Sequence, residues 1–111
     1  MQRGDVYYAN LDPSQGAETQ KTRPVVIVSN NVANRVNDLV TVLPLTSNVT
    51  RIYPFEVKLS AKETGLGKDS KAMAQQVRTL DKGRLGLRAA GRVPAALMVE
   101  IDAALRLHLA L

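Results

Sequence analysis

The sequence predicts a mainly β domain that ends in a single α-helix. Short segments rich in β-branched and aromatic residues are separated by proline, glycine and asparagine, which is typical of strands joined by turns. Only the last segment repeats apolar residues at helical spacing. Many short strands with one terminal helix indicate a small, strongly bent sheet or barrel. The length of 111 residues predicts one domain, residues 1–111.

Four segments have the composition of strands, and two more are weaker candidates. Pro24–Ser29 is a continuous β-branched run, typical of a strand buried on both faces or central in a sheet. Phe55–Leu59 instead alternates between apolar and polar residues. The predicted strands are Asp5–Leu11, Pro24–Ser29, Leu39–Pro44 and Phe55–Leu59. The weaker candidates are Lys71–Val77 and an edge strand within Arg84–Arg92.

Polar segments connect the strands, and the helix follows them. Residues 14–22 and 61–68 are predicted loops because they are polar and contain glycine, and residues 30–37 are predicted to form a turn or a short helix. Pro94 suits the first turn of a helix. The residues that recur every four positions after it are Leu97, Ile101, Leu105 and Leu109. We expect a helix from about Pro94 to about Leu107, packed on the sheet.

Composition excludes several kinds of chemistry. The chain has no cysteine and one histidine, so disulfides, thiolate nucleophiles and histidine pairs within one chain are excluded. Acidic residues are scattered singly, so we expect no metal and no cofactor. The segment Gly65–Ser70 does not match the spacing of a phosphate-binding loop. No signal peptide or membrane-spanning segment is present, so we expect a cytoplasmic protein that does not contact a membrane.

The chain is basic, with a formal net charge of +5 and an isoelectric point near 9.9, which favours an acidic partner such as nucleic acid. The densest run is Arg78–Arg92, whose basic residues are Arg78, Lys82, Arg84, Arg88 and Arg92. Such a run is either a solvated face or an electrostatic track for a phosphodiester backbone. Composition leaves both interpretations open.

Arg23 and Thr46 are notable because each lies at one end of a predicted strand. A guanidinium can hold a phosphate by two parallel hydrogen bonds, and a hydroxyl can donate to the same group. The structural alternatives are that Arg23 pairs with Glu18 on the surface and that Thr46 caps a turn. Residue types and positions alone favour these structural roles.

Five blocks of the sequence, in order, resemble the MazF/PemK family of toxins of bacterial toxin–antitoxin systems. The resemblance covers essentially the whole chain. The blocks are RGDVYYANLDP (3–13), GAETQKTRPVVIVSN (16–30), PLTS (44–47), YPFEVKL (53–59) and QQVRTLDKGRL (75–85).

The resemblance implies a small SH3-like or CcdB-like barrel that forms a homodimer. It also implies a metal-independent endoribonuclease that cuts single-stranded RNA, often mRNA, at short sequence motifs and is neutralised by a MazE-like antitoxin. Operator DNA is a further implied partner, bound together with the antitoxin.

The same resemblance implies the site residues. Arg23 and Thr46 match the catalytic pair of the family, and Glu18 falls on its loop glutamate. Substrate binding is expected from Ser47, Gln76 and Arg78. The implied reaction is attack of the neighbouring 2′-hydroxyl on phosphorus. Arginine is a poor base because its pKa is above 12, so Glu18 is the chemically easier base.

Two other functions compete with RNA cleavage. One is a CcdB-like toxin that poisons DNA gyrase by binding it, and the other is a basic SH3-like module that binds RNA or protein without cutting. A gyrase binder has no need for the Arg23 and Thr46 pair, so its presence favours the nuclease.

Overall fold

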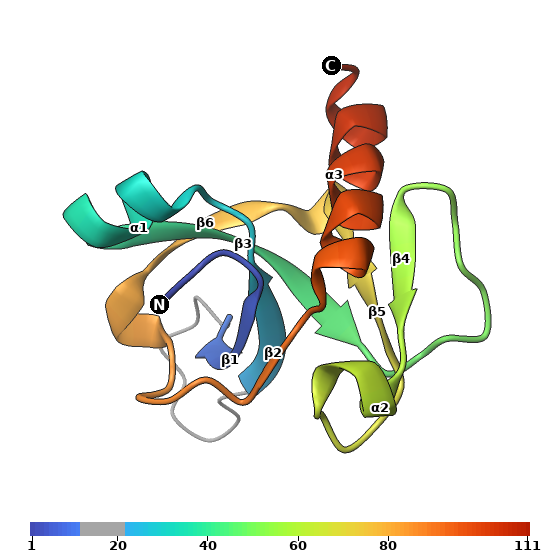
Figure 1. Ribbon diagram of the computed structural model, residues 1–111, viewed down its shortest axis with the longest axis horizontal. Helices are drawn as coiled ribbons and strands as arrows, with labels where there is room; N and C mark the ends of the chain where they lie inside the picture. The colour runs from blue at the N-terminus through green and yellow to red at the C-terminus, as the bar shows by residue number, and fades with distance from the viewer. Residues whose placement is uncertain (12–21) are drawn as a thin grey trace.

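The computed structural model shows a curled antiparallel sheet with one long helix packed against it (Figure 1). It describes residues 1–11 and 22–111. The strands are β1 (Asp5–Asn10), β2 (Thr22–Ile27), β3 (Leu39–Thr46), β4 (Glu56–Leu59), β5 (Ser70–Met73), β6 (Arg78–Asp81) and β7 (Gly91–Arg92). The α-helices are α1 (Asn31–Val36), α2 (Ala61–Thr64) and α3 (Ala95–Leu109). Two short 3₁₀ helices are η1 (Ala74–Gln76) and η2 (Lys82–Arg84).

The sheet curls around β3, its longest strand. The strand order is β4-β5-β3-β2-β1-β7, and β6 also pairs with β3. Along one edge β3 pairs with β2, while along the other its first half pairs with β6 and its last two residues pair with β5. β3 therefore pairs with both β6 and β5 along the same edge, and the sheet bends between these two strands. The predicted mainly β, strongly bent sheet with a C-terminal helix is confirmed.

The apolar side chains of the strands point alternately to the two faces of the sheet and build one core on each face. Val26 and Leu43 belong to the core that α3 covers, whereas Val25 and Val42 belong to the core on the opposite face. Successive side chains of a strand point to opposite faces, so a strand with apolar residues at every position is buried on both. The prediction of a central strand at Pro24–Ser29 is confirmed, because β2 lies between β1 and β3.

Three predicted segments differ from the structure. The candidate strand Lys71–Val77 ends at Met73, where the chain enters η1, and the polar strand β6 that follows was not predicted. The edge strand within Arg84–Arg92 is confined to Gly91–Arg92. The predicted loop 61–68 contains α2, which Ser60 and Glu63 stabilise by a reciprocal capping box.

The helix α3 buries a narrower stripe than its sequence predicts. Met98, Ile101 and Ala104 are buried, while Leu97 and Leu105 lie partly buried at the margin of the core. The expected stripe through Leu97 and Leu105 is therefore rotated toward Met98 and Ala104, because the sheet meets α3 on that side. At 15 residues α3 is the longest described helix, and none of the described helices has the length and apolar character needed to cross a membrane.

Candidate active site

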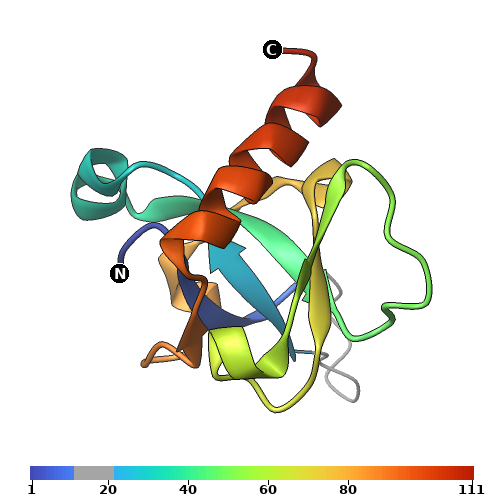
Figure 2. The same ribbon diagram turned by 45° about the vertical axis from the view of Figure 1, so that its right-hand side comes forward.

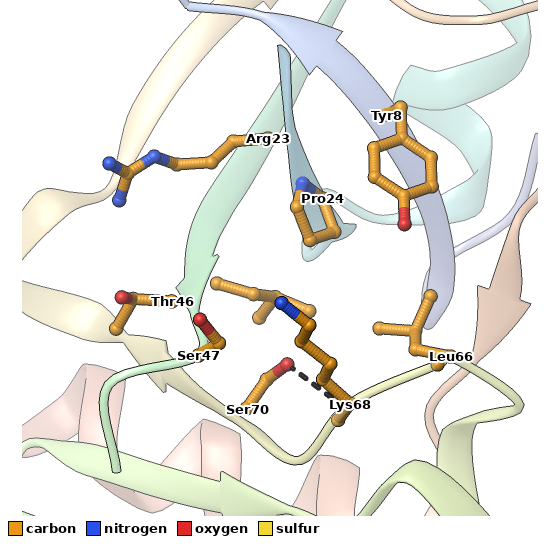
Figure 3. A pocket seen from close by; sticks show the side chains of 10 residues that line it. Tyr8, Arg23, Pro24, Thr46, Ser47, Leu66, Lys68 and Ser70 are labelled. Atoms are coloured by element: carbon orange, nitrogen blue, oxygen red, sulfur yellow. Dashed lines mark hydrogen bonds between the residues drawn. The ribbon is translucent and has the colours of Figure 1, made fainter. Parts of the chain in front are cut away.

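A groove of about 470 Å³ opens where β2 begins and β3 ends (Figure 3). Its walls come from three parts of the chain that are distant in sequence: the strand pair β1–β2, the end of β3, and the turn between α2 and β5. Arg23, Thr46 and Ser47, three of the residues singled out in the sequence, line this groove. Its apolar lining residues are Pro24, Leu45 and Leu66.

Strand register explains why Arg23 and Thr46 line the same groove. The paired residues of β2 and β3 run from Ile27 opposite Val42 to Val25 opposite Pro44. Continued by two residues, the same register places Arg23 opposite Thr46. Directly opposite side chains in an antiparallel pair lie on the same face of the sheet. Figure 3 shows both side chains extending in the same direction, with the guanidinium above the threonine.

The local chemistry of this pair suits an anion. The Arg23 side chain is exposed, and the proline after it keeps the backbone of Arg23 extended. The Thr46 hydroxyl oxygen accepts a hydrogen bond of 3.3 Å from the backbone N–H of Asn48. Accepting this bond does not use the hydroxyl hydrogen, so Thr46 can still donate to a ligand. Together the two residues offer several donors at one edge of the groove.

Lys68 and Tyr8 also line the groove, although sequence reasoning did not select them. Lys68 lies in the turn after α2, and Figure 3 shows its side chain extending into the groove. Tyr8 is half-exposed, and its ring lies across the groove from Arg23 (Figure 3). The segment Gly65–Ser70 gave no recognisable motif, because its contribution depends on a turn that brings one lysine beside distant strands. No local signal in the sequence would have found it.

Gln76 and Arg78, which are also predicted site residues, do not line the groove. Gln76 is exposed at the end of η1. Arg78 is half-buried at the start of β6, and its guanidinium donates a hydrogen bond of 3.3 Å to the carbonyl of Leu11. Glu18 lies outside the described residues, so its expected pairing with Arg23 is not described either.

The basic run Arg78–Arg92 is divided among several structural contacts. The ammonium of Lys82 donates to the carbonyl of Asn34, and Arg92 pairs with Asp5 at 2.5 Å. Arg84 donates a hydrogen bond of 3.3 Å to the carbonyl of Asn10. Three cations of this run therefore make contacts within the chain, and an electrostatic track along the run stays a prediction.

A buried ion pair lies beside Thr46 on the neighbouring strand. Lys71 pairs with Thr46 in the β3–β5 register, and its ammonium lies 2.9 Å from the carboxylate of Glu56. Burial of the Glu56 carboxylate acts to raise its pKa, but three hydrogen-bond donors outweigh this effect. The backbone N–H of Tyr53, the amide of Gln75 and the Lys71 ammonium all donate to the carboxylate, and together they hold its pKa below the usual value.

Metal-ligating side chains are not clustered in the part of the chain that the structure describes: no group of three or more His, Cys, Asp or Glu residues could hold a metal ion there. His108 is exposed near the end of α3. The polar side chains that line the groove are those of an arginine, a lysine, a threonine, two serines and a tyrosine.

Comparison with known proteins shows that nearly the whole chain matches one protein family. Residues 2–109 match the family described as PemK-like, MazF-like toxin of type II toxin–antitoxin system. The chain is 47% identical to the endoribonuclease MazF9 of Mycobacterium tuberculosis, over 98% of this chain and 96% of that protein.

Two solved structures show the same fold. One is an endoribonuclease in complex with its cognate antitoxin from a mycobacterial species, with a TM-score of 0.81 and 32% identity over 100% of this chain and 96% of that one. The other is a MazE–MazF complex from Deinococcus radiodurans, with a TM-score of 0.83 and 28% identity over 100% and 96% of the two chains.

Proposed function

The chain belongs to the PemK-like and MazF-like toxins of type II toxin–antitoxin systems and is an endoribonuclease of that family, and we propose that it cleaves single-stranded RNA without a metal ion at the groove between Arg23 and Thr46. The observation that carries this proposal is that Arg23 and Thr46 line one groove, where the β2–β3 register, continued by two residues, sets a guanidinium opposite a hydroxyl. The mRNA of the cytoplasm is the proposed substrate.

In the proposed reaction the 2′-hydroxyl of the nucleotide before the scissile bond attacks the adjacent phosphorus. A bond forms between the 2′-oxygen and phosphorus, and the bond from phosphorus to the 5′-oxygen breaks. The products are a 2′,3′-cyclic phosphate and a 5′-hydroxyl end. Negative charge accumulates on the phosphoryl oxygens in the transition state. Arg23 stabilises that charge and Thr46 orients the phosphate by donating its hydroxyl hydrogen.

Two protons move during this reaction. The 2′-hydroxyl loses one proton, and the leaving 5′-oxygen gains one. Arg23 can supply a proton to the leaving oxygen but is a poor base in its protonated form. Glu18 is our candidate for the base, since a carboxylate accepts a proton readily at neutral pH.

The rest of the groove suits the chain that flanks the scissile phosphate. Lys68 provides a cation for a neighbouring phosphate, and the half-exposed ring of Tyr8 offers a surface on which an unpaired base can stack. Ser47 adds a hydroxyl at the same edge. Stacking requires bases that are free of a partner strand, which favours single-stranded over double-stranded RNA. Gln76 and Arg78 remain proposed RNA contacts outside the groove.

Incubating the purified protein with a long RNA in the presence of EDTA tests this function. Discrete fragments with 5′-hydroxyl ends are expected. Sequencing those ends identifies the cleavage motif. Intact RNA that the protein nevertheless binds would indicate a binding module, and intact RNA together with inhibited DNA gyrase would indicate a CcdB-like toxin.

An acidic antitoxin segment is expected to block the groove. Arg23 and Lys68 are exposed there, so a segment that carries carboxylates can occupy the position of the RNA phosphates. We expect its association rate to fall steeply with added salt, while its dissociation rate changes less. Stopped-flow binding at two salt concentrations checks this. An antitoxin that binds tightly and leaves RNA cleavage unchanged would contradict it. The toxin–antitoxin complex is also proposed to bind operator DNA, which a mobility-shift assay tests.

Dimerisation is expected through the exposed side of α3. Val99, Leu107 and Leu109 are exposed on this helix, and Figures 1 and 2 show its C-terminal turns projecting beyond the sheet. A second copy would cover this apolar surface. Sedimentation equilibrium is expected to give twice the monomer mass of 12.1 kDa, and Leu107→Glu is expected to shift the protein toward the monomer. A monomer that cuts RNA at the full rate would rule out the dimer as the functional unit.

A further inference from the structure

We propose that Lys71 is a positioning residue of the active site: it anchors the loop between β3 and β4, residues 47–55, on the face of the sheet that carries the Thr46 side chain. This inference rests on the proposed RNA cleavage at Arg23 and Thr46. Lys71 itself is almost fully enclosed, so it acts through the loop and not by touching RNA.

Strand register places the ion pair and Thr46 on one face. Lys71 lies opposite Thr46 across β3 and β5, and opposite Lys58 across β4 and β5. Opposite side chains in an antiparallel sheet share a face and have Cβ atoms about 4.5–5.5 Å apart. Glu56 lies two residues before Lys58 and therefore on the same face. Lys71 is thus the immediate cross-strand neighbour of Thr46, and its partner Glu56 lies one strand further away on the same face.

The pair holds the loop at two points. The Lys71 ammonium donates to the carbonyl of Arg51 at 2.8 Å and to the carboxylate of Glu56 at 2.9 Å. The same carboxylate oxygen accepts the backbone N–H of Tyr53 at 2.9 Å. One cation and one anion therefore fix the backbone of the loop on both sides of Ile52.

Aromatic contacts add to the attachment of this part of the loop. The rings of Tyr53 and Phe55 stack with centroids 5.5 Å apart and an interplanar angle of 3°. The Lys71 ammonium lies 5.8 Å from the centre of the Tyr53 ring, close enough for a cation–π attraction. Arg51 donates to the Tyr53 hydroxyl at 3.1 Å. These contacts connect Arg51, Tyr53 and Phe55 to one another and to Lys71.

The loop in turn touches the proposed catalytic hydroxyl. It begins directly after Thr46, and its Asn48 donates its backbone N–H to the Thr46 hydroxyl oxygen at 3.3 Å. A loop that loses its anchor moves this donor, and the direction of the hydroxyl hydrogen changes with it. Displacements of about 1 Å in a catalytic group can lower a rate about 100-fold.

The burial of this pair is itself an argument for a role beyond stability. The side chains of Lys71 and Glu56 are 11% and 2% exposed. Removing two charges from water is costly, and apolar residues in their place are often as stable or more stable. Apolar residues could not donate to the Arg51 carbonyl or accept from Tyr53. The pair therefore selects one loop conformation, as polar groups do when they specify structure.

The test compares Lys71→Met with Lys58→Met, a control that removes the same charge from the same face of the sheet but at an exposed position. Steady-state cleavage of a short RNA gives kcat and KM separately, and urea unfolding confirms that each protein is folded. We expect Lys71→Met to lower kcat about 10- to 100-fold with KM changed less than about threefold. Lys58→Met is expected to keep both values.

A second variant separates position from charge. Lys71→Arg keeps the positive charge, but a planar guanidinium does not reproduce the three directions of an ammonium. We expect its kcat to fall by about 3- to 10-fold, and this variant also serves if Lys71→Met does not fold. Equal kcat for wild type and folded Lys71→Met, or for wild type and Lys71→Arg, would overturn the proposal. A raised KM at unchanged kcat would overturn it too, because Lys71 would then act in RNA binding. A wild-type protein that cuts no RNA would instead refute the proposed function.

Discussion

Arg23→Ala is expected to lower kcat/KM for RNA cleavage about 10²–10³-fold and to leave the fold intact. The expected loss follows from removing one preorganised donor that stabilises charge in the transition state. The fold is expected to survive because the Arg23 side chain is exposed and belongs to neither core. Initial rates on a short RNA, with thermal unfolding measured in parallel, check both parts.

Thr46→Ala is expected to give a loss of the same order for the same reason. If the two residues act on one phosphoryl group, the double variant should lose less than the product of the two single losses. Arg35→Ala is the matched control, since Arg35 is an exposed arginine on α1 that does not line the groove. A folded Arg23→Ala protein that cleaves RNA at the wild-type rate would show that the proposed mechanism is wrong.

Strands could be predicted where burial dictates composition. The run Pro24–Ser29 was recognised because a strand packed on both faces needs an apolar residue at nearly every position. The strand β6 was missed because it buries only Leu80 among polar neighbours, so its sequence has no strand pattern. Its pairing with β3 is decided by the bend of the sheet, which no local pattern records.

The active site could be predicted in part for a similar reason. Each of Arg23 and Thr46 lies at the end of a predicted strand, but only the structure shows that the two line one groove. Lys68 and Lys71 have no local sequence signal, since a turn brings Lys68 into the groove and distant partners, Arg51 and Glu56, hold Lys71. For Arg78 the sequence suggested RNA contact, and the structure adds a bond to the carbonyl of Leu11. Its contact with RNA stays a prediction.

Gly91→Ala is expected to lower the free energy of unfolding by about 3 kcal/mol, near the upper end of the usual range for overpacking. A Cβ atom at Gly91 would lie 2.4 Å from the carbonyl oxygen of Thr64, which is backbone and cannot rotate away. Urea unfolding measures the loss, and Gly67→Ala is the control because a Cβ there meets nothing within 4 Å.

The same clash connects stability to the active site. Thr64 ends α2, and the turn that follows carries Leu66 and Lys68 into the groove. Relieving the clash requires α2 to move away from β7, and we expect this movement to displace the Lys68 wall and raise KM for RNA at temperatures where the variant is still folded. Cleavage assays well below the unfolding midpoint test this second effect. A Gly91→Ala protein with the wild-type unfolding midpoint would contradict the packing of α2 against β7. A destabilised variant with unchanged KM would show instead that β5, and not α2, holds the groove wall.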